Sequence, residues 1–211
     1  MSAMKSFSIA ILLALFCISS SNLFAQEPAR DLLKPNKIVF EGDMAALLAQ
    51  LADLHKVNIG LETDPTQPRT WVKVDFRFAT VDDLLEGIIK AAPAYRWRNK
   101  AGFIDVYPAE GGCPLLETAI AEFHVDNTDW LGATESLISL PEIAREKSAL
   151  GLSRRESDNQ RPQVVLFSLD LKNVSLREAL HEITKTSRNS FWMFKRFGQR
   201  GQEFSISNAP S

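Results

Sequence analysis

Two stretches of this 211-residue chain decide the fold prediction, because the second repeats the first. Residues 72–97 read VKVDFRFATVDDLLEGIIKAAPAYRW, and residues 167–192 read FSLDLKNVSLREALHEITKTSRNSFW. The two align without a gap at an offset of 95, with five identical positions: Asp75/Asp170, Leu85/Leu180, Ile88/Ile183, Lys90/Lys185 and Trp97/Trp192. Both copies also carry the same hydrophobic periods in the same order, which indicates an internal structural repeat.

Each copy begins with the pattern of a strand and continues with that of a helix. Apolar and polar side chains alternate from Val72 to Phe78 and from Phe167 to Lys172, the period of a half-buried strand. Thr80 and Ser175 then supply hydroxyl N-caps, each followed three residues later by a carboxylate, and apolar residues recur at helical spacing. An aromatic strand, a turn and a further strand predict a hairpin at the end of each copy.

A further strand and helix precede each copy. In the first, residues 38–40 lead to a helix capped by Asp43 and then to a short strand at 57–61. In the second, residues 119–125 lead to a helix that either ends near Pro141 or is followed by a short helix that this proline opens. We therefore predict an α+β fold of two small tandem β-α-β-β-α-β-β modules, each with two helices packed on short sheets.

The N-terminal residues have the pattern of a secretory signal peptide. Lys5 precedes an apolar run at residues 9–18, which is about half the roughly 18 residues of a membrane-spanning helix, and cleavage is predicted between Ala25 and Gln26. An uncleaved anchor is the alternative. The predicted organisation is a signal peptide (1–25), an N-terminal linker (26–36), a first module (37–108), a linker (109–118) and a second module (119–208) with a mobile loop (152–163).

Composition excludes several classes of protein. A net charge of −2 argues against a strongly basic nucleic-acid binder, and 10 Gly, 10 Pro and 2 Cys are too few for collagen-like, disordered or disulfide-rich chains. Cys17 lies within the signal peptide, so the mature chain keeps Cys113 alone and has no internal disulfide. Two small cores without a disulfide suggest that the repeats support each other or that a partner supports both.

The residue types of enzyme sites occur without a recognisable arrangement. Cys113, His124 and Asp126 allow a nucleophilic set to be imagined, but no nucleophile elbow or oxyanion loop accompanies them. Cys113 is alternatively a spare thiol or a site of intermolecular pairing. We interpret His124, His55 and His181 as surface or partly buried polar residues. No metal-ligand spacing or Gly-rich phosphate loop is present, so we predict no catalytic, metal or cofactor residues.

Two basic clusters interleave cations with aromatic residues, at positions 96–100 and 195–200. Binders of single-stranded nucleic acid use such a pattern. Both clusters fall on predicted hairpins of an exported chain, so we interpret them as solvated turns beside core aromatics and expect no nucleic-acid partner. Anionic lipid, peptidoglycan and an acidic partner surface stay open as ligands.

The repeated pattern resembles the secretin and TonB short N-terminal (STN) domain, which is also the first periplasmic domain of secretins. The sequence pattern of that family looks like this order: an alternating strand, then Asn-Val-Thr or Ser-Leu, then an acidic pair. A Leu-rich helix and an aromatic strand before a Gly turn follow. Residues 173–180, NVSLREAL, match it closely, whereas residues 78–85, FATVDDLL, depart at their first two positions. The resemblance is strongest in residues 72–107 and 165–206 and, with the upstream halves included, covers roughly residues 37–108 and 119–208, most of the mature chain. It rests on pattern and order, without an invariant chemical motif.

The resemblance implies a small α+β module that binds other proteins in the periplasm. The expected partner is a component of a secretin, pilus or TonB-linked system, with no small-molecule substrate and no enzymatic activity. Peripheral association with the outer membrane is compatible with this role. The alternatives are a cell-wall or lipid-surface binding protein and a periplasmic thiol hydrolase that uses Cys113 and His124.

Overall fold

The structure, a computed structural model, describes much of the chain outside its N-terminal region. The described residues belong to one compact unit. The described residues are 37–67, 69–77, 80–155, 164–197 and 202–208. The predicted signal peptide, its cleavage site at Ala25 and Gln26, and the 26–36 linker lie outside them. Within the described part of the chain, no helix is both long and apolar enough to cross a membrane.

The first half of the chain contains five strands and two helices in its described residues. They are β1 (Lys37–Asp43), α1 (Met44–His55), β2 (Asn58–Glu62), β3 (Trp71–Arg77), α2 (Val81–Ala91), β4 (Tyr95–Lys100) and β5 (Phe103–Pro108). The predicted caps start both helices: Asp43 accepts a hydrogen bond from the Ala45 amide, and Thr80 forms a capping box with Asp83.

The second half repeats this order with additions. Its elements are a 3-10 helix (Pro114–Glu117), β6 (Ala119–Thr128), α3 (Trp130–Ile138), α4 (Pro141–Ala149), β7 (Ser153–Arg154), β8 (Phe167–Ser175), α5 (Leu176–Thr186), β9 (Phe191–Phe197) and β10 (Glu203–Ser207). Pro141 opens α4, because a first-turn residue needs no amide hydrogen. Ser175 and Glu178 form the second capping box.

The predicted mobile loop at 152–163 is partly wrong. Ser153 and Arg154 form β7, which pairs in parallel with β10. The amide of Ser153 donates to the Gln202 carbonyl and that of Arg155 to the Phe204 carbonyl. A polar segment can join a sheet as an edge strand because main-chain groups, not apolar side chains, make the ladder. Residues 156–163 of this loop lie outside the described residues.

The strands of both halves share one sheet. Its order is β4-β5-β2-β9-β10-β7, so three strands come from each half, and β2 pairs in parallel with β9. The same pairings recur on both sides of this joint: β4–β5 and β9–β10 are antiparallel, and β2–β5 and β7–β10 are parallel. The remaining strands form antiparallel pairs, β1–β3 and β6–β8.

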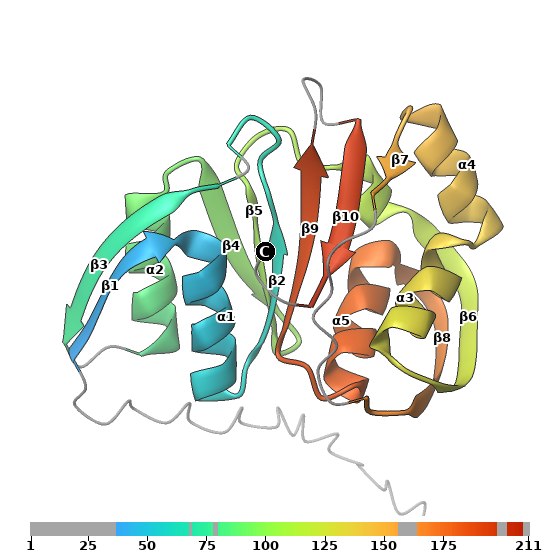
Figure 1. Ribbon diagram of the computed structural model, residues 1–211, viewed down its shortest axis with the longest axis horizontal. Helices are drawn as coiled ribbons and strands as arrows, with labels where there is room; N and C mark the ends of the chain where they lie inside the picture. The colour runs from blue at the N-terminus through green and yellow to red at the C-terminus, as the bar shows by residue number, and fades with distance from the viewer. Residues whose placement is uncertain (1–36, 68, 78–79, 156–163, 198–201, 209–211) are drawn as a thin grey trace, which may run out of the picture. The chain divides into compact units, whose positions relative to one another are not determined.

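The six-stranded sheet separates two hydrophobic cores. Alternate side chains of β9 belong to different cores: Phe191 and Met193 pack with α1 and α2, whereas Trp192 and Phe194 pack with α3 and α5. Figure 1 shows the resulting layers, with α1 and α2 between β1–β3 and the central sheet, and α3 and α5 between that sheet and β6–β8. The predicted α+β class is confirmed. Separate tandem modules are not confirmed, because one sheet runs through both halves.

Candidate functional site at the junction of the two halves

Four charged or titratable side chains are buried where the two halves meet. Glu62, Asp105, Arg177 and His181 are all at most 5% exposed, and we call them the junction network. Such groups are almost never fully buried unless they are paired. The first two residues come from the first half and the last two from the second, so the network joins segments far apart in the sequence.

Local structure explains why these side chains converge. Glu62 is the last residue of β2, and Asp105 lies in β5 between Ile104 and Val106, which belong to the first core. Because side chains alternate along a strand, Asp105 points to the opposite face of the sheet, toward α5. Arg177 and His181 are four residues apart on α5 and therefore share one helical face.

Arg177 is the centre of the ion pairs. Its Nη2 donates to Glu62 Oε2 at 2.8 Å and its Nε to Glu117 Oε1 at 2.7 Å, while Nη1 lies 3.8 Å from Asp105 Oδ1. Burial alone would lower the pKa of this guanidinium, but the hydrogen bond to Glu62 and the charges of Asp105 and Glu62 outweigh it and raise the pKa. Nη1 is buried and donates no hydrogen bond within the described residues.

His181 uses both ring nitrogens. Nε2 lies 2.6 Å from Asp105 Oδ1, and the Trp192 indole nitrogen lies 3.1 Å from Nδ1. An indole N–H can only donate, so we assign Nδ1 as the acceptor and place the ring proton on Nε2, which donates to Asp105. Burial alone would raise the pKa of Asp105, but the hydrogen bond from His181 and the charge of Arg177 hold it below its usual range.

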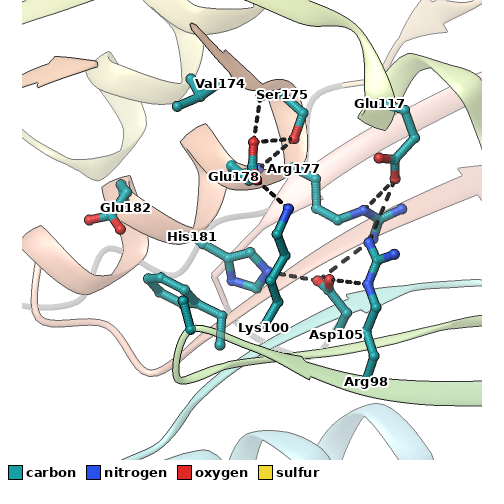
Figure 2. Close-up of a pocket in the computed structure, with 12 residues that line it drawn as sticks. Arg98, Lys100, Asp105, Glu117, Val174, Ser175, Arg177, Glu178, His181 and Glu182 are labelled. Carbon is teal, nitrogen blue, oxygen red and sulfur yellow. Dashed lines mark hydrogen bonds and ion pairs between the residues drawn. The ribbon is translucent and has the colours of Figure 1, made fainter. Parts of the chain in front are cut away.

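A cavity of about 230 Å³ adjoins the network and is bordered by a second ion pair. Lys100 reaches from β4 to α5, where its Nζ lies 2.6 Å from Glu178 Oε1 (Figure 2). The Lys100 hydrogen bond and the Ser175 amide lower the pKa of Glu178 to about 2. Arg98 lies beside this pair and donates from Nε to Asp105 at 3.0 Å. Charged residues from both halves therefore line the cavity.

Cys113 borders a neighbouring cavity of about 290 Å³ without presenting a free thiolate. Its amide donates to Glu62 Oε1, and the residue is 3% exposed. Burial raises the pKa of the thiol. A buried thiol with a raised pKa is a poor nucleophile, since the thiolate is the reactive form.

His124 and Asp126 form contacts with other residues than Cys113. Both side chains are exposed on β6 and flank the buried Val125, as the alternation predicts. His124 Nδ1 lies 3.0 Å from Asp170 Oδ1 across the β6–β8 pair, and Asp126 accepts a hydrogen bond from Ser168. No contact given by the structure joins either residue to Cys113.

The interpretation of the other histidines is correct in part. His55 is half-buried at the end of α1. His181 is buried, which corrects its reading as a surface or partly buried residue. Its helix is strongly amphipathic by sequence, but α5 packs on the central sheet as well as on α3, so a polar position also becomes covered.

The two basic clusters differ in their surroundings. Arg96, Arg98 and Lys100 lie exposed on β4, consistent with the solvated interpretation. Lys195 is 8% exposed within β9, so the second cluster is only partly solvated, and burial lowers the pKa of this amine. Residues 198–200 of that cluster lie outside the described residues.

The junction network is not predicted by the sequence patterns above. One local signal was present, because Asp105 interrupts an otherwise apolar and aromatic strand, FIDVYP. Glu62 and Arg177 are 115 residues apart, and no local period connects positions at that separation. Such pairs depend on how the sheet is assembled.

The geometry favours a structural joint over a reaction centre. Both nitrogens of His181 are engaged, and Arg177 is held by carboxylates from two segments. Within the described ranges, no group of three or more His, Cys, Asp or Glu side chains could hold a metal ion. The network can therefore fix the relation between β2, β5 and α5 but offers no free nucleophile or base in the residues described.

Comparison with known proteins gives no relative to argue from. The chain matches no protein-family model, no curated protein and no solved structure.

Proposed function

We propose that this chain is an exported, non-enzymatic protein-binding module that works in the periplasm as an accessory of an envelope secretion, pilus or TonB-linked signalling system. The leader-like pattern of residues 1–25 and the resemblance of both repeats to STN domains support this proposal. The engaged state of the junction network is consistent with a binding role. Association with the outer membrane is part of the proposal.

The observation that carries the proposal is a pair of exposed apolar side chains on the outer face of β1–β3. Trp71 is 70% exposed and Val39 is 59% exposed on this face. Between them lies the Glu41–Lys73 ion pair at 2.6 Å. Tryptophan is enriched in the energetic centres of protein interfaces, because it offers a large rigid surface with few rotatable bonds. Exposed Trp71 therefore suits protein recognition.

A pull-down from envelope extract tests this role. We expect the purified protein to retain a specific envelope protein, and Trp71→Ala to lose it. Leu54→Ala is the matched control, since Leu54 is also a large exposed residue but lies on α1. Failure of the unaltered protein to retain any envelope protein would contradict the proposal, and sedimentation with purified peptidoglycan would favour the cell-wall alternative.

The enzymatic alternative has a separate test. Cys113→Ser removes the thiol while nearly preserving its volume. We expect this variant to retain the envelope protein and to support the same cellular phenotype as the unaltered chain. Loss of the phenotype with normal folding and normal partner retention would instead favour a thiol enzyme.

A further inference from the structure

We propose that the free edge of β4 binds an extended acidic segment of a partner protein as an added parallel strand, with carboxylates beside Arg96 and Arg98. This inference rests on the proposed protein-binding function and names the edge and the chemistry that the partner needs. Strand addition is a general mode of peptide recognition in which main-chain hydrogen bonds give affinity and side chains give selectivity.

The joint between the halves provides the template. β2 adds in parallel to β9, with the Ile59 amide donating to the Ser190 carbonyl and the Thr63 amide to the Phe194 carbonyl, each at 2.9 Å. The 95-residue offset of the repeat makes β4 the counterpart of β9, with Tyr95 and Asn99 at the positions of Ser190 and Phe194. The chain itself thus shows which strand polarity this type of edge accepts.

The main-chain groups of β4 face outward at the matching positions. The Ala109 amide donates to the Ala94 carbonyl at 2.8 Å, which makes this pair a hydrogen-bonded pair of the antiparallel β4–β5 ladder. Because such pairs alternate along an antiparallel ladder, Trp97 and Asn99 direct their main-chain groups away from β5. Within the described part of the chain, β5 is the only strand that pairs with β4.

Side chains on this edge select for acidic residues. Arg96 is exposed and bonds to main-chain carbonyls, those of Pro93 at 3.2 Å and Tyr95 at 2.9 Å, with no carboxylate partner among the described residues. If a strand adds to β4 in the register that β2 has on β9, three consecutive residues of that strand lie beside Arg96, opposite Trp97 and beside Arg98. Alternate acidic residues would therefore lie beside the Arg96 guanidinium, which lacks a carboxylate, and beside that of Arg98, which also donates to Asp105.

The position opposite Trp97 calls for a small residue. In the template, Gly60 lies opposite Trp192, and a Cβ at Gly60 would lie only 2.4 Å from the indole ring. Trp97 holds the equivalent position in the first repeat. The preferred segment is therefore acidic, small, acidic, in that order along an extended strand.

Binding also exchanges one interaction of Arg96 for another. Its guanidinium bonds to the Tyr95 carbonyl, which is the counterpart of the Ser190 carbonyl that accepts from β2. An incoming amide can take this carbonyl, and the released guanidinium then pairs with the incoming carboxylate. Charge-assisted bonds are stronger than neutral ones, so the exchange favours an acidic strand.

A second copy of this chain suits the edge less well. Its matching strand would be β7, which has two residues, and the repeat geometry would place another helix over Arg96 and Arg98 as α1 covers Phe191 and Met193. Covering the Arg96 guanidinium without a carboxylate would be costly. Charged edge residues are a common defence against edge-to-edge self-association.

Fluorescence anisotropy with labelled synthetic peptides tests the proposal on the purified protein. The probe Val-Thr-Glu-Gly-Glu-Val-Thr should bind, and Val-Thr-Lys-Gly-Lys-Val-Thr should bind at least about tenfold more weakly, the loss expected for one charge-assisted hydrogen bond. Arg96→Glu should reduce affinity for the acidic peptide by at least the same factor, while Arg145→Glu on α4 should not.

A proline variant tests the main-chain part of the proposal. Asn99→Pro removes an outward amide, at a site where an edge strand tolerates proline, and should weaken the acidic peptide, whereas Asn99→Ala should not. No binding of the acidic peptide, equal binding of the lysine peptide, or unchanged binding to Arg96→Glu would overturn the inference. Retention of an envelope protein equally by Arg96→Glu would overturn it while leaving the proposed function intact. Binding of the acidic peptide without retention of any envelope protein would support the inference about β4 but contradict the proposed function.

Discussion

β4 and β9 hold equivalent places in the repeat but have different neighbours. β9 lies between β2 and β10. Its Phe191 and Met193 side chains point away from the helices of the second half and are buried in the first core. β4 is an edge strand, and the same positions are Arg96 and Arg98. Trp97 and Trp192 are unchanged between the copies, because each faces the helices of its own half. The two equivalent strands thus carry different side chains at the positions that are covered by the other half in β9 and exposed to water in β4.

The comparison also explains why charged groups are buried at the joint. Adding β9 to β2 brings α5 over Glu62 and Asp105, and Arg177 enters from α5 as their counter-charge. At the free edge of β4, the Arg98 and Lys100 side chains remain 45% and 67% exposed and reach toward the same region. The most informative variants change either the joint between the halves or the free edge of β4 and leave the other unchanged.

Removing the central guanidinium should have the largest effect. Arg177→Met leaves the fully buried Glu62 carboxylate without its main partner, so we expect the free energy of unfolding to fall by about 3–5 kcal/mol. Chemical denaturation measures the change. Adding Glu62→Leu to this variant should restore part of the loss, because the uncompensated charge disappears with it.

A surface pair provides the control for that experiment. Lys172 and Glu122 lie 3.4 Å apart across β6–β8 with both side chains mostly exposed. Lys172→Met should cost less than about 1 kcal/mol, since solvent screens such pairs. Equal costs for Lys172→Met and Arg177→Met would mean that the junction network does not hold the halves together.

Crowding the β2–β9 contact should have the next largest effect. Gly60→Ala places a methyl group against the Trp192 ring, at 2.4 Å without relaxation, and we expect a loss of about 1–3 kcal/mol in a denaturant titration. In Gly112→Ala the nearest atom to the new methyl is 3.7 Å away, so that variant should change stability by less than about 0.5 kcal/mol. A neutral Gly60→Ala would show that the joint is loosely packed.

Acidification should loosen the contact between β4 and α5. The pKa of Glu178 falls from 4.5 to about 2 in the folded chain, and that of Asp105 is also lowered. A lowered carboxyl pKa stabilises the fold above the unfolded value, and this contribution is lost as the pH falls from about 4.5 toward about 2. Because Glu178 is partly exposed, its share should be about 1 kcal/mol or less.

Unfolding titrations at several pH values between neutrality and pH 2 measure this dependence. Glu178→Gln should flatten the slope in the stated window, and Glu203→Gln on β10 serves as the control for loss of one carboxylate. A slope that Glu178→Gln leaves unchanged would assign the acid sensitivity to Asp105 and the rest of the chain.

Giving β4 the character of β9 should change stability least. Arg96→Phe copies the residue at the equivalent position, and we expect the free energy of unfolding to change by less than about 0.5 kcal/mol. It should instead cause concentration-dependent self-association, visible by analytical ultracentrifugation, because it exposes an apolar side chain on an unpaired edge. Arg145→Phe on α4 is the matched control, and equal association of both variants would argue against a special role for this edge.

Much of the local structure could be predicted from particular residues. Asp43, Thr80 and Ser175 cap helices as expected, and Pro141 opens the short helix that was one of the two outcomes its position allowed. These features depend on neighbours within a few positions. β7 was missed because a two-residue edge strand leaves no periodic signal. The burial of His181 was missed because it depends on contacts with distant segments.

The sequence by itself determined the repeat, the order of most of its strands and helices and the α+β class, because hydrophobic period and capping residues act over one or two turns of chain. Only the tertiary structure decided that β2 pairs with β9, that the halves share one sheet, and that Glu62 meets Arg177. Strand edges can accept many partners through the same main-chain hydrogen bonds, so the choice among them is made by packing on both faces of the assembled sheet. The side chains agree with this pairing, because the face of β4 at Arg96 and Arg98 is polar and the equivalent face of β9 is apolar.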